Sequence, residues 1–198
     1  MLGILFMASA TFLSEISDSL GRRAVRNHTE SIYTMGFLSI FWSAIFLIAA
    51  GIWRHSFIFS LASLPFFAVR SILEILQLHM GILAIVKSER SSYGFIRTMT
   101  VPLLLIADLA LGYAIGLKQI IGIIIIFLAL IILFLDRGIN RRGVGFVIFS
   151  AVNAVLTISL FKYDIAHFNS VEAEQSIIYI ILMIYLFLAL ILCTKKIL

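Results

Sequence analysis

The sequence has few of the residues on which soluble and secreted domains rely. Of its 198 residues, one is a cysteine and two are prolines, and Asp, Glu, Lys and Arg together make up 13%. The single cysteine, Cys193, excludes an intrachain disulfide, and soluble domains carry about 25% charged residues. The hydrophobic fraction is 62% and the mean hydropathy is +1.14, whereas soluble domains are about 45–50% apolar. The composition therefore predicts a membrane protein.

Motifs of enzyme chemistry are also missing from the sequence. It contains no Gly-x-Ser-x-Gly nucleophile motif, no glycine-rich phosphate loop and no cluster of His, Asp and Glu with metal-ligand spacing. We therefore expect no enzyme activity, no metal and no cofactor, and the same absence disfavours an intramembrane enzyme.

Long apolar runs dominate what the sequence does contain. A helix needs about 20 apolar residues to cross a bilayer, and the runs predict an all-α polytopic membrane protein with about seven transmembrane helices. The first run has no basic segment before it and is expected to be a helix rather than a signal peptide. The seven helices are expected at Leu2–Leu20, Ser31–Trp53, Phe57–Ile85, Ser92–Gly116, Lys118–Leu135, Gly143–Phe161 and Glu174–Cys193.

Basic residues are divided unequally between the connections. Three lie on one side of the membrane in the predicted topology, at Arg54, Lys118 and Lys162. Eleven lie on the other side, in or beside the first, third and fifth connections and the C-terminal tail: Arg22, Arg23, Arg26, Lys87, Arg90, Arg97, Arg137, Arg141, Arg142, Lys195 and Lys196. Because cytoplasmic loops carry an excess of Lys and Arg, the second set is predicted to be cytoplasmic and the N-terminus external. The basic residues thus indicate topology, and no nucleic-acid partner is expected.

The stretch from Lys87 to Leu135 combines a proline, a glycine turn and a helix that starts with glutamine. Pro102 lies early in the fourth expected helix, Gly112-Tyr113 follows, and Gln119-Ile120-Ile121-Gly122 opens the fifth. This pattern, a hairpin of two helices, resembles the end of an EamA domain, the five-helix repeat of the drug/metabolite transporter superfamily. Tyr113 stands where that family often has Glu. The resemblance implies a secondary transporter built from two such repeats.

An internal repeat agrees with this resemblance. At an offset of 142 residues, six pairs are identical: Gly3 and Gly145, Ile16 and Ile158, Ser17 and Ser159, Ala24 and Ala166, Asn27 and Asn169, and Glu30 and Glu172. The second copy starts five helices after the first, and an odd number of helices inverts its topology, as in many secondary transporters. Both Asn-x-x-Glu sequences precede a helix, and we expect them to form capping boxes.

The repeat divides the chain into two parts. Residues 1–138 form the first EamA-type repeat of five helices, and residues 143–198 form the first two helices of a second, inverted repeat. Two whole repeats need ten helices, so we expect the chain to be a fragment of a longer transporter. The alternative is a seven-helix protein.

Ionisable residues inside the expected helices are the candidate site. Each costs about 2.5–3.5 kcal/mol at the bilayer centre, so such groups usually face the bundle interior. In the first helix Glu15, Asp18 and Arg22 share one face. Ser14-Glu15-Ile16 followed by Arg23 resembles the first helix of the small multidrug resistance family, and the resemblance implies that Glu15 is a proton and cation site. The alternative is that Glu15 and Asp18 pair with the nearby arginines at the membrane interface.

Three more helices carry candidate residues. In the third, Arg70, Glu74 and Gln77 share a face, where Arg70 and Glu74 can pair. We expect this row of polar side chains either to face the substrate or to fix the packing of the helices. In the fourth, Asp108 follows Pro102 and is expected near the midplane, as a proton site or as a partner of a neighbouring helix. In the sixth helix, we expect Asn153 either to line the substrate and proton pathway or to bridge two packed helices.

Together these features predict a secondary transporter of a small metabolite or drug-like solute in the cytoplasmic membrane of a prokaryote. The expected mechanism is proton-coupled alternating access. The expected partners are the lipid bilayer, a small-molecule substrate and protons, with a second copy of the chain as a candidate partner in a homodimer. The alternative function is a membrane scaffold or assembly subunit that transports nothing.

Overall fold

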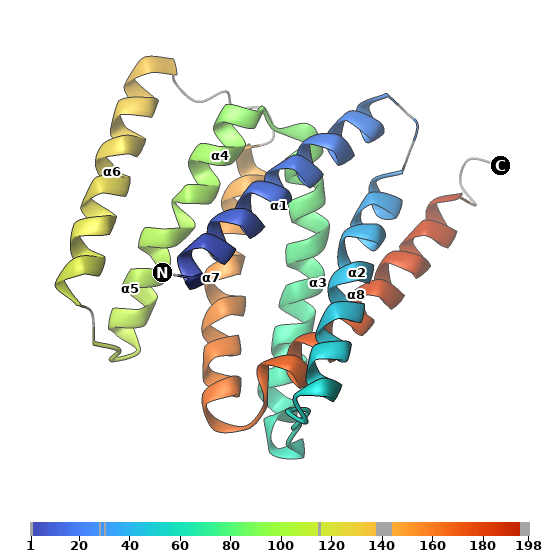
Figure 1. Cartoon of the computed structure of the whole chain (residues 1–198). Helices are drawn as coiled ribbons and strands as arrows, with labels where there is room; N and C mark the ends of the chain where they lie inside the picture. The colour runs from blue at the N-terminus through green and yellow to red at the C-terminus, as the bar shows by residue number, and fades with distance from the viewer. Residues whose placement is uncertain (1, 28, 30, 115, 138–143, 195–198) are drawn as a thin grey trace.

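The computed structural model describes residues 2–27, 29, 31–114, 116–137 and 144–194, and within these residues all regular structure is helical (Figure 1). The helices are α1 (Leu2–Arg26), α2 (Ile32–Trp53), the 3-10 helix η1 (Leu61–Ser63), α3 (Leu64–Lys87), α4 (Arg90–Thr98), α5 (Thr100–Ala110), α6 (Leu117–Arg137), α7 (Val144–His167) and α8 (Val171–Thr194). The predicted all-α class is therefore confirmed.

Five segments are long and apolar enough to cross a membrane. They are Tyr33–Trp53, Leu61–Ile85, Ser92–Ala110, Val144–His167 and Val171–Leu192. They correspond to α2, α3, the α4–α5 pair, α7 and α8. In α6 the segment Leu117–Ala129 is a shorter apolar run, and α1 is not among the five. Among the described residues, five segments are thus of membrane-spanning type, and crossings by α1 and α6 stay predictions.

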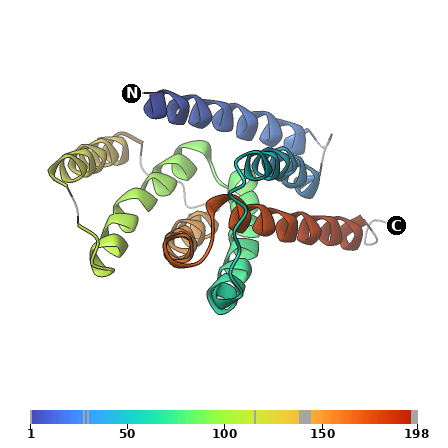
Figure 2. The same cartoon turned by 60° about the horizontal axis from the view of Figure 1, so that its bottom comes forward.

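Helices far apart in the sequence pair in the bundle. α2 packs along α8 and α3 packs along α7, while α4 and α5 lie against α7. α1 runs obliquely across one face of this layer, and α6 stands apart at one edge (Figure 1). The view in Figure 2, turned by 60°, shows the same separation of α1 and α6 from the rest. The centre of the molecule is therefore made by α2, α3, α7 and α8.

Two clusters of buried side chains hold this centre together. One joins α2, α3 and α8 and consists of Ile40, Phe67, Ile82, Ile178, Leu182 and Leu186. The other joins α3, α4 and α7 and consists of Ala84, Ile96, Val147 and Ala151. Two small alanines in the second cluster let α3 and α7 approach closely, which is how helices gain dispersion energy in lipid.

Pro102 interrupts the predicted fourth helix. α4 ends at Thr98 and α5 begins at Thr100, with Met99 between them. A proline has no N–H for the carbonyl four residues earlier, and its ring clashes with that carbonyl. The carbonyl is that of Thr98, so the break lies where the missing hydrogen bond predicts it.

A glycine turn connects α5 to α6. Gly112 has φ +81°, a left-handed conformation that favours glycine. At the start of α6, Gln119 Oε1 accepts a hydrogen bond from the Gly116 N–H at 2.9 Å, which is half of a capping box. The turn and the helix start agree with the predicted hairpin, but α6 diverges from α5 instead of packing along it (Figure 2).

The predicted Asn-x-x-Glu capping boxes are wrong. Ser31 caps α2, and its side chain accepts from the Thr34 N–H at 3.0 Å. Ser170 lies in the same position before α8 and accepts from the Ala173 N–H at 3.2 Å. Each helix begins later than the Asn-x-x-Glu pattern assumes, so Asn169 is free for other contacts. Glu30 lies outside the described residues.

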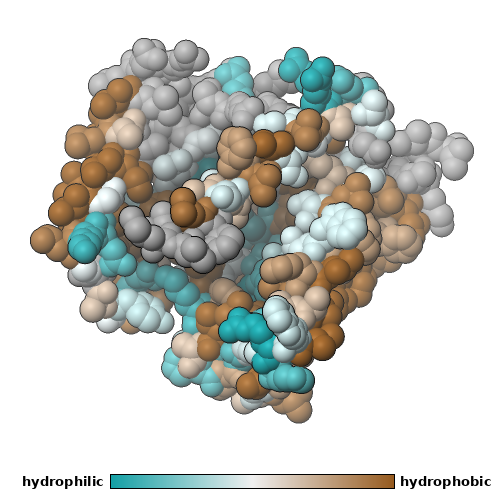
Figure 3. Space-filling model, in the orientation of Figure 1, coloured by the Kyte–Doolittle hydropathy of each residue, from teal (hydrophilic) through white to brown (hydrophobic). Residues whose placement is uncertain are grey.

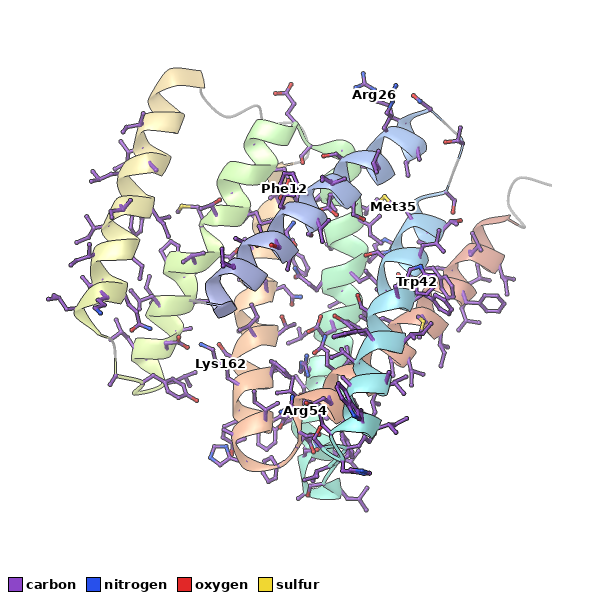
Figure 4. All side chains as sticks on the ribbon, viewed as in Figure 1. Phe12, Arg26, Met35, Trp42, Arg54 and Lys162 are labelled. Atoms are coloured by element: carbon purple, nitrogen blue, oxygen red, sulfur yellow. The ribbon has the colours of Figure 1, made fainter. Side chains whose placement is uncertain are left out.

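The two ends of the bundle are polar. Arg26 lies at one end, and Arg54 and Lys162 lie toward the other (Figure 4); we call these the Arg26 end and the Arg54 end. Figure 3 shows apolar surface over the sides and hydrophilic atoms gathered toward these ends. This distribution fits helices embedded in a bilayer with polar ends in the interfaces.

Candidate functional site

A cavity of about 970 Å³ lies between α1 and the central layer. α1, α2, α3, α7 and the α4–α5 pair all contribute to its wall, which is mainly apolar. Met35 and Trp42 of α2 line it, and both are labelled in Figure 4. Pockets of about 300–1,000 Å³ with a few polar groups are typical of small-molecule sites.

An ion pair joins α1 to α4 at the cavity wall. Arg97 Nη1 lies 3.6 Å from Asp18 Oδ2 and donates a hydrogen bond to the Tyr93 hydroxyl at 2.7 Å. All three side chains line the cavity. They lie toward the Arg26 end, and the two charges are half-exposed to exposed. The pair can therefore open without leaving a buried charge.

An amide network forms the opposite wall, between α3 and α7. Gln77 Nε2 donates to Ser150 Oγ at 2.8 Å, and Gln77 Oε1 accepts from Asn153 Nδ2 at 3.0 Å. Asn153 Nδ2 also donates to the Leu73 carbonyl at 2.8 Å. Gln77 and Ser150 line the cavity, whereas Asn153 is buried behind them. Asn153 thus bridges two packed helices, the alternative noted from the sequence.

A separate cluster of buried charges lies toward the Arg54 end, around Arg70. The Arg70 side chain is 2% exposed, and its Nη1 donates to Glu174 Oε1 on α8. Nη2 donates to Gln175 Oε1 at 2.7 Å and lies 3.4 Å from Glu74 Oε1. The guanidinium carbon is 4.4 Å from the ring centroid of Phe161 on α7. The predicted Arg70–Glu74 pair is present, and the tighter partner of Arg70 is Glu174.

Asn169, in the loop before α8, supplies a further hydrogen bond to Glu174. Asn169 Nδ2 donates to Glu174 Oε2 at 3.2 Å and to Ser63 Oγ at 3.0 Å, while Asn169 Oδ1 accepts from the Ser60 N–H at 2.9 Å. The carboxylate of Glu174 is therefore bonded on both oxygens, which is what a buried charge requires. The network ties the start of α8 to the start of α3.

A second buried carboxylate belongs to the same cluster. Asp164 is fully buried in the last turn of α7, and within the described residues neither of its carboxylate oxygens has a hydrogen-bond partner. It lies close enough to Arg70 and Glu174 for their charges to interact. No group of three or more His, Cys, Asp and Glu side chains among the described residues could hold a metal ion.

Of the predicted site residues, Asp18 and Gln77 line the cavity, and Glu15 and Asp108 belong neither to its wall nor to the Arg70 cluster. Glu15 is exposed on α1, while its neighbour Asp18 lines the cavity. Asp108 is paired with Lys162 of α7, whose Nζ lies 2.7 Å from each carboxylate oxygen. α5 ends at Ala110, so Asp108 lies in the last turn of the helix. The predicted helix ran on to Gly116 and placed Asp108 nearer its centre, and a position near the membrane midplane stays a prediction.

Sequence reasoning missed Asp164 and Glu174. The sixth helix is predicted to end at Phe161, before Asp164, but α7 continues to His167. Glu174 was placed at the first residue of its helix, where acidic residues commonly interact with the helix dipole. The one sequence feature that points to further carboxylates here is Arg70, because a buried cation needs more than one partner.

No family model, curated protein or solved structure matches this chain. The function is therefore argued from the cavity, the charge cluster and the arrangement of the helices.

Proposed function

We propose that this protein is a secondary membrane transporter of a small metabolite or drug-like solute, with transport coupled to protons. The observation that carries the proposal is the cavity of about 970 Å³ walled by helices from both parts of the chain. Its mainly apolar wall and its few polar groups suit a partly apolar solute. The solute would bind between α1 and the α3–α7 pair.

The helix pairing supports an inverted repeat of EamA type. In such a repeat α1 corresponds to α7 and α2 to α8. α2 packs along α8, so equivalent helices meet at the centre, as an axis relating two repeats requires. α3 packs along α7, so the third helix of one repeat meets the first helix of the other. In this proposal the chain crosses the membrane seven times, with α1 and α6 as two of the crossings.

Alternating access would use the weak contact of α1 with the rest of the bundle. α1 meets α4 through the half-exposed Asp18–Arg97 pair, and it meets α2 where Gly21 faces the Met35 side chain. An exposed ion pair contributes about 0–1 kcal/mol, so its opening costs little. Movement of α1 would open the cavity toward the Arg26 end, which the excess of basic residues marks as cytoplasmic.

Transport in liposomes tests this proposal. The full chain is reconstituted, a pH gradient is imposed, and a pH-sensitive dye in the lumen reports proton movement after addition of amino acids, nucleotide sugars or cationic dyes one at a time. We expect at least one solute class to increase proton flux, and a reversed gradient to reverse its direction.

A cavity-filling variant makes the test specific. A Cβ on Gly81 would meet only Ser150 Oγ, at 3.9 Å, so Gly81→Leu should fold and occupy the cavity. Gly145→Leu, at a position with no atom within 4 Å of a Cβ, is the matched control. Loss of solute-driven flux in Gly81→Leu alone supports transport through the cavity. No response to any solute in the wild type would favour the alternative, a membrane scaffold or assembly subunit.

A further inference from the structure

The Arg70 cluster contains more carboxylates than its cation can balance. Glu74 of α3, Asp164 of α7 and Glu174 of α8 surround one guanidinium. Other polar groups around this end have contacts of their own. They form the pairs Asp108 with Lys162 and Arg54 with Glu172, and His167 Nδ1 lies 2.9 Å from the Tyr163 carbonyl oxygen.

Asp164 is the carboxylate of this cluster that, within the described residues, accepts no hydrogen bond. Arg70 directs Nη1 to Glu174 and Nη2 to Gln175 and Glu74, so within the described residues no donor reaches the Asp164 oxygens. Its side chain is fully buried. An ionised carboxylate without hydrogen bonds is strongly disfavoured in an apolar interior, whereas the neutral acid is tolerated.

We propose that Asp164 is a proton-binding site, occupied at neutral pH, and that Arg70 is the group that exchanges with the proton. Taking up the proton converts the carboxylate to the neutral acid, with the proton supplied by bulk water. A metal ion does not suit the site, because both Glu174 oxygens are already bonded and, among the described residues, the three carboxylates are not arranged as a group that could hold a metal.

The geometry around Arg70 allows this cation to replace the proton as the partner of Asp164. Its Nε is buried and, within the described residues, has no hydrogen-bond partner, so a free donor and a free acceptor occur in one cluster. When Asp164 loses its proton, Arg70 is the cation that can compensate it. Turning toward Asp164 weakens the contact of Arg70 with Glu174. Proton occupancy would thus decide whether α3 is held to α7 or to α8 at this end.

Proton binding by Asp164 is argued from the cluster alone, and only its role rests on the proposed transport function. In that function, proton binding would be the step that links a proton to a helix rearrangement. Its test uses proton binding and not transport, so the two proposals fail separately. If Asp164 binds a proton but no solute moves, the site stands and the transport proposal falls.

Infrared difference spectroscopy on the full chain in lipid nanodiscs measures the proton directly. A protonated carboxyl has a carbonyl stretch that is absent from the carboxylate and shifts in D₂O. We expect this band at neutral pH and its loss at alkaline pH in the wild type. Asp164→Asn should lack the band, whereas Asp108→Asn, which removes a carboxylate paired with Lys162, should retain it.

A second measurement does not depend on folding of a variant. Aspartate labelled with ¹³C in the wild-type protein should shift the band, because Asp164 is one of only four aspartates in the sequence. An unshifted band would place the proton on a glutamate and overturn the proposal. Retention of the full band in a folded Asp164→Asn variant would also overturn it, as would loss of the band on adding sodium ions at constant pH, which would indicate a cation site.

Discussion

At the scale of single residues, the ion pair between Arg70 and Glu174 carries the largest expected energy. Both side chains are buried, so removing one partner leaves the other charge without compensation. We expect Arg70→Met and Glu174→Met each to lower the free energy of unfolding by about 3–5 kcal/mol, and the double variant to lose less than the sum. Chemical unfolding in detergent measures this.

The pair Arg54–Glu172 provides a control in which one partner is exposed. Its Arg54 side chain is 70% exposed and its Glu172 side chain 13%, so Arg54→Met should lower the free energy of unfolding by less than either buried substitution does. Strictly additive losses from the two buried substitutions would contradict a direct interaction between Arg70 and Glu174.

Glu15 and Asp18 can be distinguished at the same scale. Asp18 lines the cavity and pairs with Arg97, whereas Glu15 is exposed on α1. We expect Asp18→Asn to open the contact of α1 with α4 and to raise the modification rate of a Ser17→Cys probe in the cavity. The pair is worth about 0–1 kcal/mol, so the increase should be at most about fivefold.

Two controls complete this comparison. Glu15→Gln makes the same change of charge one turn away and should leave the modification rate unchanged. The exchange of charges in Asp18→Arg with Arg97→Asp should bring the rate back toward the wild-type value. A larger effect of Glu15→Gln than of Asp18→Asn would instead return Glu15 to the site, as its resemblance to the small multidrug resistance glutamate implies.

At the scale of elements, the sequence indicates where helices lie better than where they end. Hydropathy locates the apolar runs, and Pro102 predicts the break at Met99, because both are properties of local residues. The ends of α5 and α7 were misplaced by six residues each, at Gly116 for Ala110 and at Phe161 for His167. α5 ends early at the Gly112 turn, a local feature. α7 continues past Phe161 because tertiary contacts outweigh polarity: Lys162 pairs with Asp108, and Asp164 lies beside the Arg70 cluster.

The α4–α5 break gives an element-scale prediction. Pro102→Ala restores an N–H that can donate to the Thr98 carbonyl, so α4 and α5 should merge into one straighter helix. Spin labels at Gly94→Cys and Leu111→Cys, in a Cys193→Ser background, report the end-to-end distance. We expect the mean distance to lengthen in Pro102→Ala. An unchanged distance would mean that packing against α7, and not the proline, fixes the break.

At the scale of the whole molecule, the charge distribution predicts orientation. Eleven Lys and Arg residues lie on one side of the predicted topology and three on the other, so the Arg26 end should be cytoplasmic. In a Cys193→Ser background, an impermeant thiol reagent added outside intact cells should label Ala114→Cys and not Asn27→Cys. Both positions are exposed. After lysis both should react, and labelling of Asn27→Cys in intact cells would reverse the orientation.

If α6 crosses the membrane as we propose, its separation from the other helices makes it depend on the surrounding lipid. Its 21 residues extend over about 30 Å, close to the hydrocarbon thickness of a bilayer. Apolar side chains along one face of it, such as Leu117, Ile125 and Ile132, are more than half exposed. A helix in a bundle takes its tilt from its neighbours, whereas α6 would take its tilt from the thickness of the membrane. Thinner bilayers should therefore tilt α6 while the α3–α7 pair keeps its angle, which makes α6 the part of the molecule that responds to membrane composition.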